Sequence, residues 1–393
     1  MSRRTFGLSG VAGALAGIVL AANFAVAGGI EDANVRDFPR LAGETDDAPR
    51  FRRAIAAASD GVVAVPKGEY EIATMLYVTN RCSLLMHPNA HLKAVAKMNY
   101  VVFWDGHDDY HALSVFDAEG KLRDPAGSFI RGGDIDGCGL ASCLALANAH
   151  HFTLRDTVLH NGRRAGLCVS RETGGHLYEL IADNVYCKTT MSGLAGNVGI
   201  DCQCADCHFI DCIVVDYTVS IRDCGGGNRF QRCHVWGGTV PPRGMGFREW
   251  SEYYAKVKKL ELSGKFDAAV EKELLAKGLP EMLKDSIAFD IRAGGSIFDG
   301  CYADTAEIGF NICSDTTIRS SGFFNNRRMG LRKSTVVVHR GGFVTVDGCV
   351  FNGPARVEKL YEGTGKNLVW RNVRAFNGDG MARDSAKLSA GER

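Results

Sequence analysis

The sequence contains little proline, no excess of charge of either sign and only one long apolar run. Its 9 prolines stand against 47 glycines, a balance that many short strands joined by tight turns would produce. The 46 basic and 45 acidic residues leave a net charge of +1, which gives no indication of a nucleic-acid or membrane-surface partner. A near-neutral surface does not single out a strongly anionic polymer as substrate either, although a local basic cleft could still bind one.

The long apolar run lies at the N-terminus. Residues 2–6, S-R-R-T-F, resemble a twin-arginine export signal, and they are followed by the apolar residues 7–22 and the small residues A-V-A at 25–27. We expect cleavage near Ala27 and a periplasmic or secreted mature protein. A transmembrane anchor is the alternative, and no other segment is apolar and long enough to span a bilayer. The folded domain is expected over residues 28–376, with a C-terminal tail over 377–393.

A short repeat indicates how the 393 residues, 46% of them hydrophobic, form a core. From residue 130 onward, an apolar residue, two bend residues and a small residue recur at intervals of roughly 20 to 28 residues. The instances are Ile130…Gly133, Leu154…Thr157, Ile181…Asn184, Phe209…Cys212, Phe230…Cys233, Phe298…Cys301, Ile318…Ser321, Val346…Cys349 and Val369…Asn372. One coil cannot bury its own apolar face but a pile of coils can, so the repeat predicts an all-β solenoid.

The small residues of the repeat should stack as a ladder inside the coils. Four of them are cysteines, and the 14 cysteines of an exported chain would ordinarily suggest disulfides. In such a ladder cysteine acts as a small buried hydrophobe, so we expect free thiols, with a bridge between adjacent rungs as the alternative. The predicted ladder is Thr157, Asn184, Cys212, Cys233, Cys301, Ser321, Cys349 and Asn372.

Each coil is predicted to contain three short strands. A first strand precedes each repeat by about eight or nine residues, as in residues 199–202, 220–223, 289–292 and 336–338. The second strand ends at the repeated apolar residue. The third strand begins at the small residue, after a bend of two residues.

The N-terminal part supplies a cap and a family resemblance. Asp46 and Asp47 precede an amphipathic helix over residues 51–58, as acidic N-caps do. Residues 61–72 follow, with the pattern V-x-V-P-x-G-x-Y, and residues 133–139 read G-D-I-D-G-C-G. The D-D pair, the helix and V-x-V-P-x-G-x-Y resemble the opening of pectate-lyase-superfamily proteins. The G-x-I-D-G-x-G segment is similar to one in polygalacturonase-like members, which belong to glycoside hydrolase family 28.

This resemblance extends over about residues 40–376. It implies a right-handed parallel β-helix that acts on saccharides. The reactions implied are glycoside hydrolysis, β-elimination of uronic-acid polymers, fructosyl transfer and C5-epimerisation.

The step from Phe230 to Phe298 is too long for one coil and predicts an insertion over about residues 241–286. Residues 249–283 have the pattern of two amphipathic helices. The residues expected on one apolar face are Tyr253, Tyr254, Val257 and Leu260. The insertion leaves after a third strand and returns into a first strand. It should therefore hang over the groove beside the first strands, where the resemblance implies that saccharide binds.

Alternation along the first strands places charged residues on their outer face. Asp201, Arg222 and Asp290 point outward in three successive coils, which separates the two carboxylates by about 9–10 Å. That is the upper part of the range for the acid and base of an inverting glycosidase. We therefore expect Asp201 and Asp290 to be the acid–base pair and Arg222 to orient the substrate, with Asp223 bent towards the site. The alternative is a stabilising Asp–Arg–Asp ladder on a solvated face.

A second cluster is predicted on the outer face of the third strands. There His234 should stack on Tyr302, and Trp236 should lie near Asp304. Trp and Tyr faces suit sugar rings, and an exposed Trp is costly without a use. We expect these four residues, together with Arg292 on a first strand, to bind substrate. The alternative is that the insertion packs on these aromatic rings.

The sequence gives little support for a metal or cofactor. Cys204 and Cys207 have the C-x-x-C spacing of a zinc knuckle, but no second pair is present, so we expect no structural metal. Calcium held by carboxylates, as in some lyases of the superfamily, would accompany only a lyase activity. Several basic residues on loops or strand ends could line a cleft, although no spacing distinguishes them: His107, His111, His160, Arg163, Arg164 and Lys188.

The favoured function is a glycoside hydrolase that acts on a polysaccharide or oligosaccharide. The N-T-D and G-H-G motifs of polygalacturonases are absent, and Arg222-Asp223 stands where their catalytic D-D pair would be expected, so the sequence does not assign galacturonan as the substrate. A lyase is the first alternative, in which Arg222, Arg292 or Lys188 serves as base or neutralises a uronate carboxylate. A non-catalytic saccharide-binding or scaffold module is the second, and it would need Trp236 and Tyr302 rather than the carboxylates.

Overall fold

The structure is a computed structural model of the chain. It describes residues 32–58, 61–78, 82–106, 127–148, 151–169, 179–190, 196–237, 284–324, 334–352, 357–363, 366–376 and 382–384, together with scattered residues from 239 to 282. The predicted export signal, His107 and His111 lie outside the described residues. No helix within the described ranges is apolar and long enough to cross a membrane.

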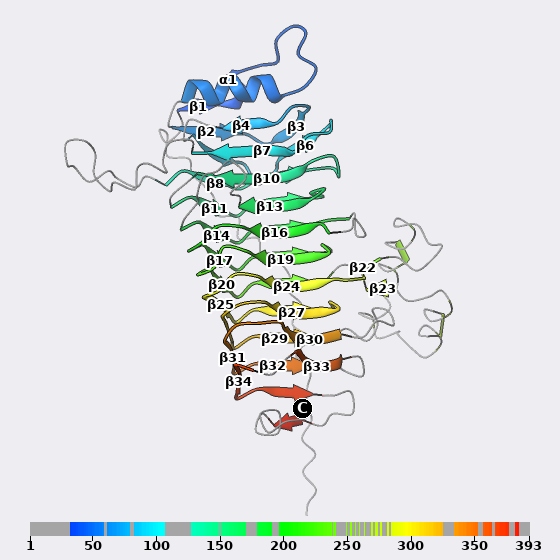
Figure 1. Cartoon of the computed structure of the whole chain (residues 1–393). Helices are drawn as coiled ribbons and strands as arrows, with labels where there is room; N and C mark the ends of the chain where they lie inside the picture. Colours follow the sequence, from blue (N-terminus) through cyan, green and yellow to red (C-terminus); the bar gives the residue numbers. More distant parts are fainter. Residues whose placement is uncertain are drawn as a thin grey trace, which may run out of the picture. The chain divides into compact units, whose positions relative to one another are not determined.

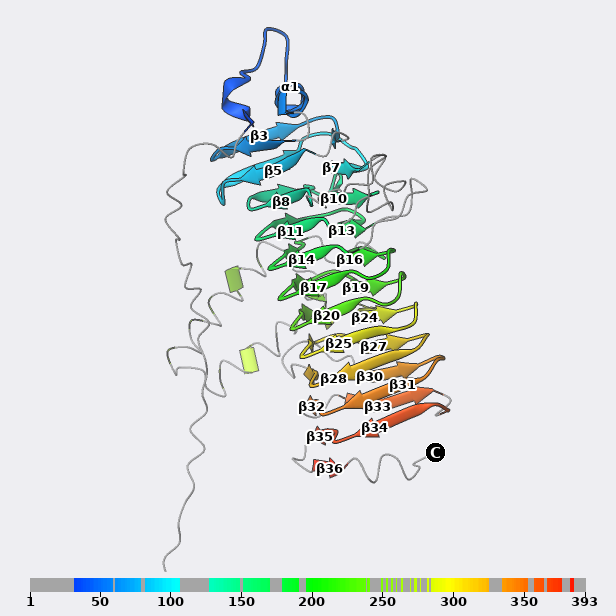
Figure 2. The ribbon, with the colours of Figure 1, turned by 90° about the vertical axis from the view of Figure 1, so that its left-hand side faces the viewer.

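The described strands form three parallel sheets that run the length of a single stack of coils (Figure 1). The chain folds as a right-handed parallel β-helix with three strands per coil, which confirms the predicted fold class and the fold that the superfamily resemblance implied. The sheet of first strands faces the viewer in Figure 1, and the sheet of second strands is in view in Figure 2.

The sheet of first strands has ten members in the described residues. They are β4 (Leu76–Val78), β7 (Tyr100–Asp105), β10 (Ser142–Ala147), β13 (Ala165–Val169), β16 (Val198–Cys202), β19 (Val219–Asp223), β24 (Ile287–Ile291), β27 (Ile308–Ile312), β30 (Ser334–His339) and β33 (Val357–Gly363).

The sheet of second strands begins with a two-residue strand beside the cap. Its members are β1 (Ala33–Asn34), β2 (Val62–Val65), β5 (Ser83–Met86), β8 (Phe129–Arg131), β11 (Thr153–Arg155), β14 (Ile181–Asp183), β17 (His208–Ile210), β20 (Arg229–Gln231), β25 (Ser296–Asp299), β28 (Thr316–Arg319), β31 (Val344–Asp347) and β34 (Leu368–Arg371).

The sheet of third strands ends with the one antiparallel pair among these three sheets in the described residues. Its members are β3 (Gly68–Ile72), β6 (Ala90–Ala94), β9 (Asp134–Asp136), β12 (Val158–His160), β15 (Tyr186–Lys188), β18 (Ile213–Val215), β21 (His234–Trp236), β26 (Tyr302–Asp304), β29 (Gly322–Phe324), β32 (Val350–Asn352), β35 (Arg374–Phe376) and β36 (Ala382–Asp384). Strand β36 comes from the predicted tail and pairs antiparallel with β35.

Helix α1 (Ala48–Ala58) covers the N-terminal end of the stack, after a short 3-10 turn at Val35–Asp37. Asp46 Oδ1 accepts a hydrogen bond from the backbone N–H of Ala48, as predicted for an acidic cap. Buried Asp47 instead ties the helix to the first coil, because it accepts from Glu71 N–H and pairs with Arg40 at 2.7 Å. The cap therefore covers the end of the core and contacts it through both apolar and polar side chains.

The V-x-V-P-x-G-x-Y motif folds as strand, bend and strand. It spans β2 and β3, and the Tyr70 hydroxyl donates to the carbonyl of Pro66 at 2.8 Å. The Tyr70 ring packs edge-on against Phe51 of α1, with centroids 5.2 Å apart. The motif thus locks the first coil to the capping helix.

The bend between second and third strands uses one residue in the left-handed conformation. Such residues include Asp156, Asp211, Arg232, Gly300 and Ser320, all with φ between 49° and 63°. Short polar residues and glycine tolerate this conformation best, which explains why aspartate, serine and glycine recur at this position, with Arg232 as the exception among these five.

Two rungs of the predicted ladder were wrong by one residue. At β14, Ala182 and Val185 point inward while Ile181 is exposed, and Asn184 is the left-handed bend residue. At β34, Val369 is likewise exposed and Asn372 occupies the bend. A slip of one residue exchanges the two faces of a strand, and here an apolar residue beside the inward one concealed the register. Trp370 and Val373 take the inward positions of the last coil.

The remaining rungs lie in the core as predicted, and the cysteine thiols among them donate to carbonyls of the preceding coil. Cys233 Sγ lies 3.5 Å from Phe209 O, and Cys301 Sγ lies 3.3 Å from Phe230 O. All 14 cysteines are free thiols in this structure. Beside the ladder, Phe209, Phe230 and Phe298 stack face to face, with centroids 4.8 and 4.6 Å apart. The core is therefore built mainly from like side chains that stack from one coil to the next.

The insertion leaves and returns through a short antiparallel pair, β22 (Thr239–Val240) and β23 (Glu281–Met282). The residues described between them include two helical groups. These are Glu249, Glu252, Tyr253, Lys256 and Lys259, and then Ala269, Lys272, Glu273 and Ala276. They agree with two helices in this segment, and the predicted apolar face at Tyr254, Val257 and Leu260 lies outside the described residues.

Replacing Phe230 by Ala should lower the free energy of unfolding by about 3–5 kcal/mol, because it removes the middle ring of a fully buried stack. Urea denaturation followed by circular dichroism measures the loss. The matched control is Val369→Ala on the outer face of β34, where the residue is 42% exposed and the expected change is within about 0.5 kcal/mol. Equal losses in the two variants would contradict the stacking model.

Candidate active site

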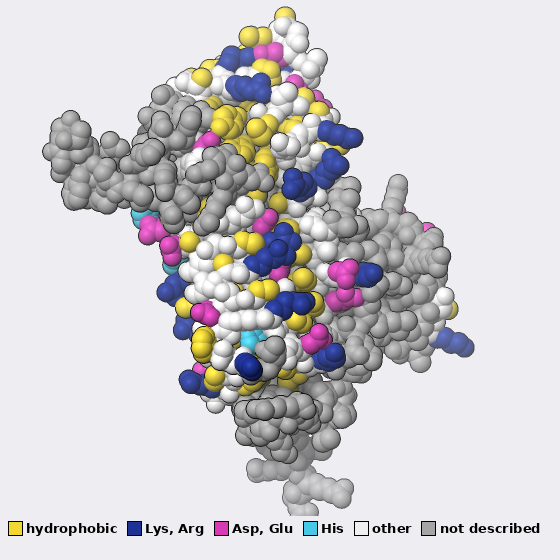
Figure 3. Space-filling model, viewed as in Figure 1, with side chains coloured by type: hydrophobic (Ala, Val, Ile, Leu, Met, Phe, Trp, Pro, Cys, Tyr) yellow, Lys and Arg dark blue, Asp and Glu magenta, His cyan; other side chains and the backbone are white. Residues whose placement is uncertain are grey.

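One outward column runs along the sheet of first strands, and its chemistry changes from apolar to charged. Strand register gives the column as Tyr77, Phe103, Ala145, Cys168, Asp201, Arg222, Asp290, Asn311, Val338 and Glu362. Figure 3 shows the same change on this face, with hydrophobic side chains nearer the cap and a cluster of basic side chains beyond them. The prediction that Asp201, Arg222 and Asp290 align in successive coils is confirmed.

The flanking inward residues explain why these three side chains point outward. Ile200, Ile221 and Phe289 precede them and are fully or almost fully buried in the core. Since successive side chains of a strand alternate, the next residue in each strand must face out. The apolar packing of the coils thus fixes the position of the charged column.

Asp290 is at the centre of the charged part but is not solvent-exposed. Its side chain is 0% exposed. Oδ2 accepts from Arg222 Nε at 3.3 Å and from Arg292 Nε at 2.9 Å, and Oδ1 accepts from Asn311 Nδ2 at 2.8 Å. Both oxygens are therefore engaged, so Asp290 organises the two guanidinium groups as well as being the second carboxylate of the predicted pair.

Asp201 has the opposite environment. Its Oδ2 lies 3.9 Å from Arg222 Nη1 and accepts weakly from Gln203 Nε2 at 3.4 Å, whereas its Oδ1 is buried with no hydrogen-bond partner. Burial raises the pKa of Asp201, and the charge of Arg222 offsets only part of this effect. A carboxyl with a raised pKa and a free oxygen is suited to exchange a proton with a bound ligand.

Asp223 does not bend towards the column, contrary to the prediction. It pairs in register with Cys202 and Ile291, both of which point into the core. Its carboxylate accepts from Asn228 Nδ2 at 2.7 Å and from the Ser296 hydroxyl. These buried amide and hydroxyl donors hold the carboxylate inside the turn, so the role of Asp223 is structural.

Two residues of the site were missed by the sequence reasoning. Asn311 continues the column by one coil, and Arg340 Nε donates to Asn311 Oδ1 at 2.9 Å. The face therefore carries Arg222, Arg292 and Arg340 around one fully paired carboxylate. Extending the strand register by one more coil would have identified Asn311, but Arg340 follows β30 and its contact depends on the three-dimensional fold.

The charged column does not fit a calcium ion. Calcium needs several oxygen ligands around one point, and here the guanidinium of Arg222 occupies the space between Asp201 and Asp290. Within the described part of the chain, no three His, Cys, Asp or Glu side chains are arranged to hold a metal.

The second predicted cluster lies on a different sheet from the first. Strand register places His234 beside Tyr302 and Trp236 beside Asp304, as predicted, and the His234 and Tyr302 rings have centroids 5.0 Å apart. Arg292, however, contacts Asp290 on the first strands. The predicted substrate-binding residues are thus divided between two faces of the coil and do not form one site.

A His–Asp–His cluster on the third strands was also missed. Asp134 Oδ2 lies 3.1 Å from His91 Nδ1 and 3.0 Å from His160 Nδ1. The hydrogen bond to Asp134 raises the pKa of His160. The sequence signal for this cluster was the alternation of side chains along β6, β9 and β12, which points His91, Asp134 and His160 outward. Lys188 lies next to His160 in register, and it does not reach the first-strand column.

Comparison with known proteins yields structural neighbours but no sequence relatives. No family model matches the sequence, and no curated protein is similar to it in sequence. ORF18 of Geobacillus virus E2 has a TM-score of 0.46 at 13% identity, over 88% of this chain and 60% of that one. The enzymatically active domain of tailspike protein 4 from bacteriophage CBA120 has a TM-score of 0.48 at 13% identity, over 86% and 43%.

A third similar structure is the endo-xylogalacturonan hydrolase from Aspergillus tubingensis, with a TM-score of 0.45 at 10% identity, over 88% of this chain and 93% of that one. This chain spans less than two thirds of the length of the two viral proteins. Because these TM-scores are low, the fold assignment rests on the strand pairing of this chain, and its function has to be inferred from its own side chains.

Replacing Asp290 by Asn should lower the free energy of unfolding by about 3–5 kcal/mol, because two guanidinium groups lose a buried carboxylate. Urea midpoints measure the effect. The control is Asp299→Asn, which breaks the exposed 2.8 Å pair with Arg319 and should cost at most about 1 kcal/mol. A loss no greater than in the control would show that the arginines are fully resolvated without Asp290.

Asp304→Asn should stabilise the protein near neutral pH. Burial raises the pKa of Asp304 from 3.8 to about 6. Its contribution to stability is therefore complete below pH 3.8 and is lost as the pH rises through about 6. We expect the variant to gain about 1–3 kcal/mol at neutral pH and nothing near pH 3.8. A pH-independent difference in urea midpoint would contradict this assignment.

Proposed function

We propose that this protein is a carbohydrate-active enzyme that cleaves glycosidic bonds of a polysaccharide or oligosaccharide on the face of the first strands. The observation that carries the proposal is the contrast between the two carboxyl groups of one column. Asp201 has a raised pKa and an unpaired buried oxygen, whereas Asp290 is held in ion pairs with two arginines. Two carboxyl groups with such different surroundings are typical of a general acid and its catalytic partner.

In hydrolysis, Asp201 would act as the general acid and protonate the leaving glycosidic oxygen. The two residues are two coils apart, which places their backbones about 9–10 Å from each other, near the upper end of the carboxyl separation at which inverting glycosidases activate a water molecule. Asp290 would accept the proton of that water once the substrate displaces Arg292, whose side chain is 54% exposed and free to move towards solvent. Arg222 lies between them and would hold substrate oxygens.

β-Elimination on a uronate is a second candidate, and the arginine cluster favours it. Arg222, Arg292 and Arg340 share one face with only two carboxylates in this cluster, so the cluster has a net positive charge. Such a surface would neutralise a uronate carboxylate and acidify the neighbouring C–H. Asp201 would then act as the base. The two reactions differ in product, because elimination leaves an unsaturated sugar that absorbs in the ultraviolet.

Asp201→Asn should reduce turnover by about 10²–10⁴-fold on the substrate found in a panel of plant, algal and bacterial polysaccharides. New reducing ends and ultraviolet absorbance are followed together, so that hydrolysis and elimination are separated. The control Asp299→Asn carries the same change on the second strands and should retain full activity.

Chemical rescue then tests the role of Asp290. If Asp290 is the base of a hydrolase, added azide or formate should restore part of the activity of Asp290→Asn. Full turnover by Asp201→Asn would exclude the proposed mechanism. Saccharide binding without turnover of any polymer would favour a non-catalytic module.

A further inference from the structure

The outer face of four successive third strands forms a second surface, which we call the third-strand platform. Register along β21, β26, β29 and β32 gives two parallel columns. The first column is His234, Tyr302, Gly322 and Val350, and the second is Trp236, Asp304, Phe324 and Asn352. The platform spans about 14 Å along the axis, at about 4.8 Å per coil.

Two polar atoms of the platform are buried without a hydrogen-bond partner. They are Nε2 of His234 and Nε1 of Trp236, which lie on the same strand and point to the same face. A buried indole N–H normally has an acceptor, because leaving it unpaired costs free energy. Burial also lowers the pKa of His234, so its imidazole is neutral near pH 7. Both atoms are covered in this structure, so they lack a partner here and would meet a ligand only when the atoms that cover them move aside.

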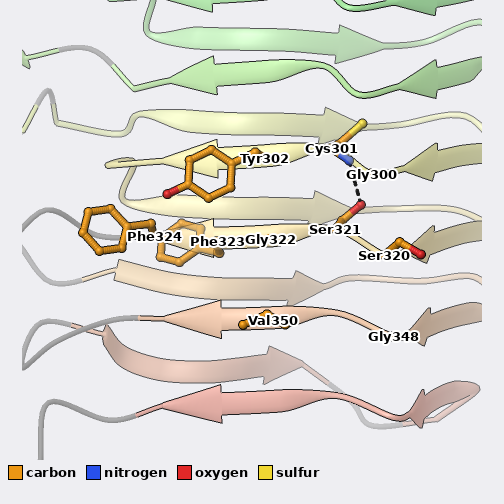
Figure 4. Close-up of a pocket in the computed structure, with 10 residues that line it drawn as sticks. All are labelled: Gly300, Cys301, Tyr302, Ser320, Ser321, Gly322, Phe323, Phe324, Gly348 and Val350. Carbon is orange, nitrogen blue, oxygen red and sulfur yellow. Dashed lines mark hydrogen bonds between the residues drawn. The ribbon is translucent and has the colours of Figure 1, made fainter. Parts of the chain in front are cut away.

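A notch interrupts the platform at Gly322. Figure 4 shows Gly322 between Tyr302 and Val350, with the Phe324 ring beside them. Tyr302 is 37% and Val350 45% exposed. The pocket has a volume of about 370 Å³, and a Cβ added to Gly322 would lie 3.0 Å from Tyr302 Cδ2. The absence of a side chain at Gly322 is therefore what opens the pocket beside the Tyr302 ring.

The charge of the platform is opposite to that of the first-strand column. Among its eight residues the only charged group near neutral pH is Asp304, whose pKa burial raises to about 6. Apart from the hydroxyl of Thr305, its carboxylate has no hydrogen bond in the described part of the chain. An ionised carboxylate accepts hydrogen bonds from hydroxyl groups and repels anionic sugars. The three arginines on the face of the first strands would instead attract anionic sugars.

We propose that the third-strand platform is a second saccharide-binding site, which takes a neutral oligosaccharide and is separate from the catalytic column. The apolar face of a sugar ring would pack on Tyr302 and into the notch at Gly322. Sugar hydroxyls would donate to Asp304, and one would accept from Trp236 Nε1 when the atoms that cover this nitrogen move aside.

Isothermal titration of the intact protein with cellohexaose, xylohexaose, mannohexaose and hexagalacturonate tests this proposal. We expect at least one of the neutral hexasaccharides to bind, and hexagalacturonate not to compete for that site. Tyr302→Ala and Gly322→Val should each weaken binding at least tenfold, the first by removing the ring and the second by filling the notch. Trp236→Phe keeps an aromatic ring but removes the N–H donor together with part of the ring surface, so its loss of affinity sets an upper limit on the contribution of the hydrogen bond.

Two controls separate this proposal from the proposed catalytic function. Phe343→Ala removes an aromatic side chain that is 69% exposed outside the platform, and it should not change binding. Asp201→Asn should bind the neutral hexasaccharide as tightly as the original protein does, whether or not it retains turnover.

Three outcomes would overturn the proposal. The first is that no neutral hexasaccharide binds at millimolar concentration. The second is that binding survives Tyr302→Ala and Gly322→Val. The third is that Tyr302→Ala lowers the urea midpoint and leaves binding unchanged, which would show that the ring serves packing alone.

Discussion

Every feature of this molecule depends on the register between successive coils. That register is set inside, where like side chains stack and where one bend residue in each repeat adopts the left-handed conformation. Once Phe209, Phe230 and Phe298 are stacked, the alternation of side chains fixes which neighbouring residues point to the outer faces. The apolar packing of the core therefore fixes the positions of the charged column and of the third-strand platform, although neither surface takes part in that packing.

The sequence allowed the fold to be predicted wherever the inward residue was distinctive. Large rings and cysteines made the register visible from Phe209 to Cys349, and the D-D and V-x-V-P-x-G-x-Y motifs located the cap. At β14 the inward residue is Ala182, which is smaller than its exposed neighbour Ile181. Hydrophobicity alone then favours the wrong face, and only the left-handed conformation at Asn184 reveals the correct one.

The candidate site was predictable in position but not in detail. Strand alternation aligned Asp201, Arg222 and Asp290, because it depends only on local geometry. The complete burial of Asp290 could not be foreseen, since it results from Arg292 folding back and from Asn311 one coil further on. Asp223 was misplaced for a related reason: the Asn228 and Ser296 groups that hold it inside the turn are recognisable as partners only in three dimensions.

The two outer surfaces share the same coils, which limits how one polymer could use both. Arg222, Asp290 and Asn311 lie on β19, β24 and β27, and the third strands of these coils, β21, β26 and β29, carry most of the platform. A short oligosaccharide that follows the axis along one sheet cannot reach the other without crossing the edge of the coils. The platform would therefore hold a separate glycan, or a distant part of the same polymer. Their opposite charges favour the same division, because a chain segment suited to the arginines is repelled by Asp304.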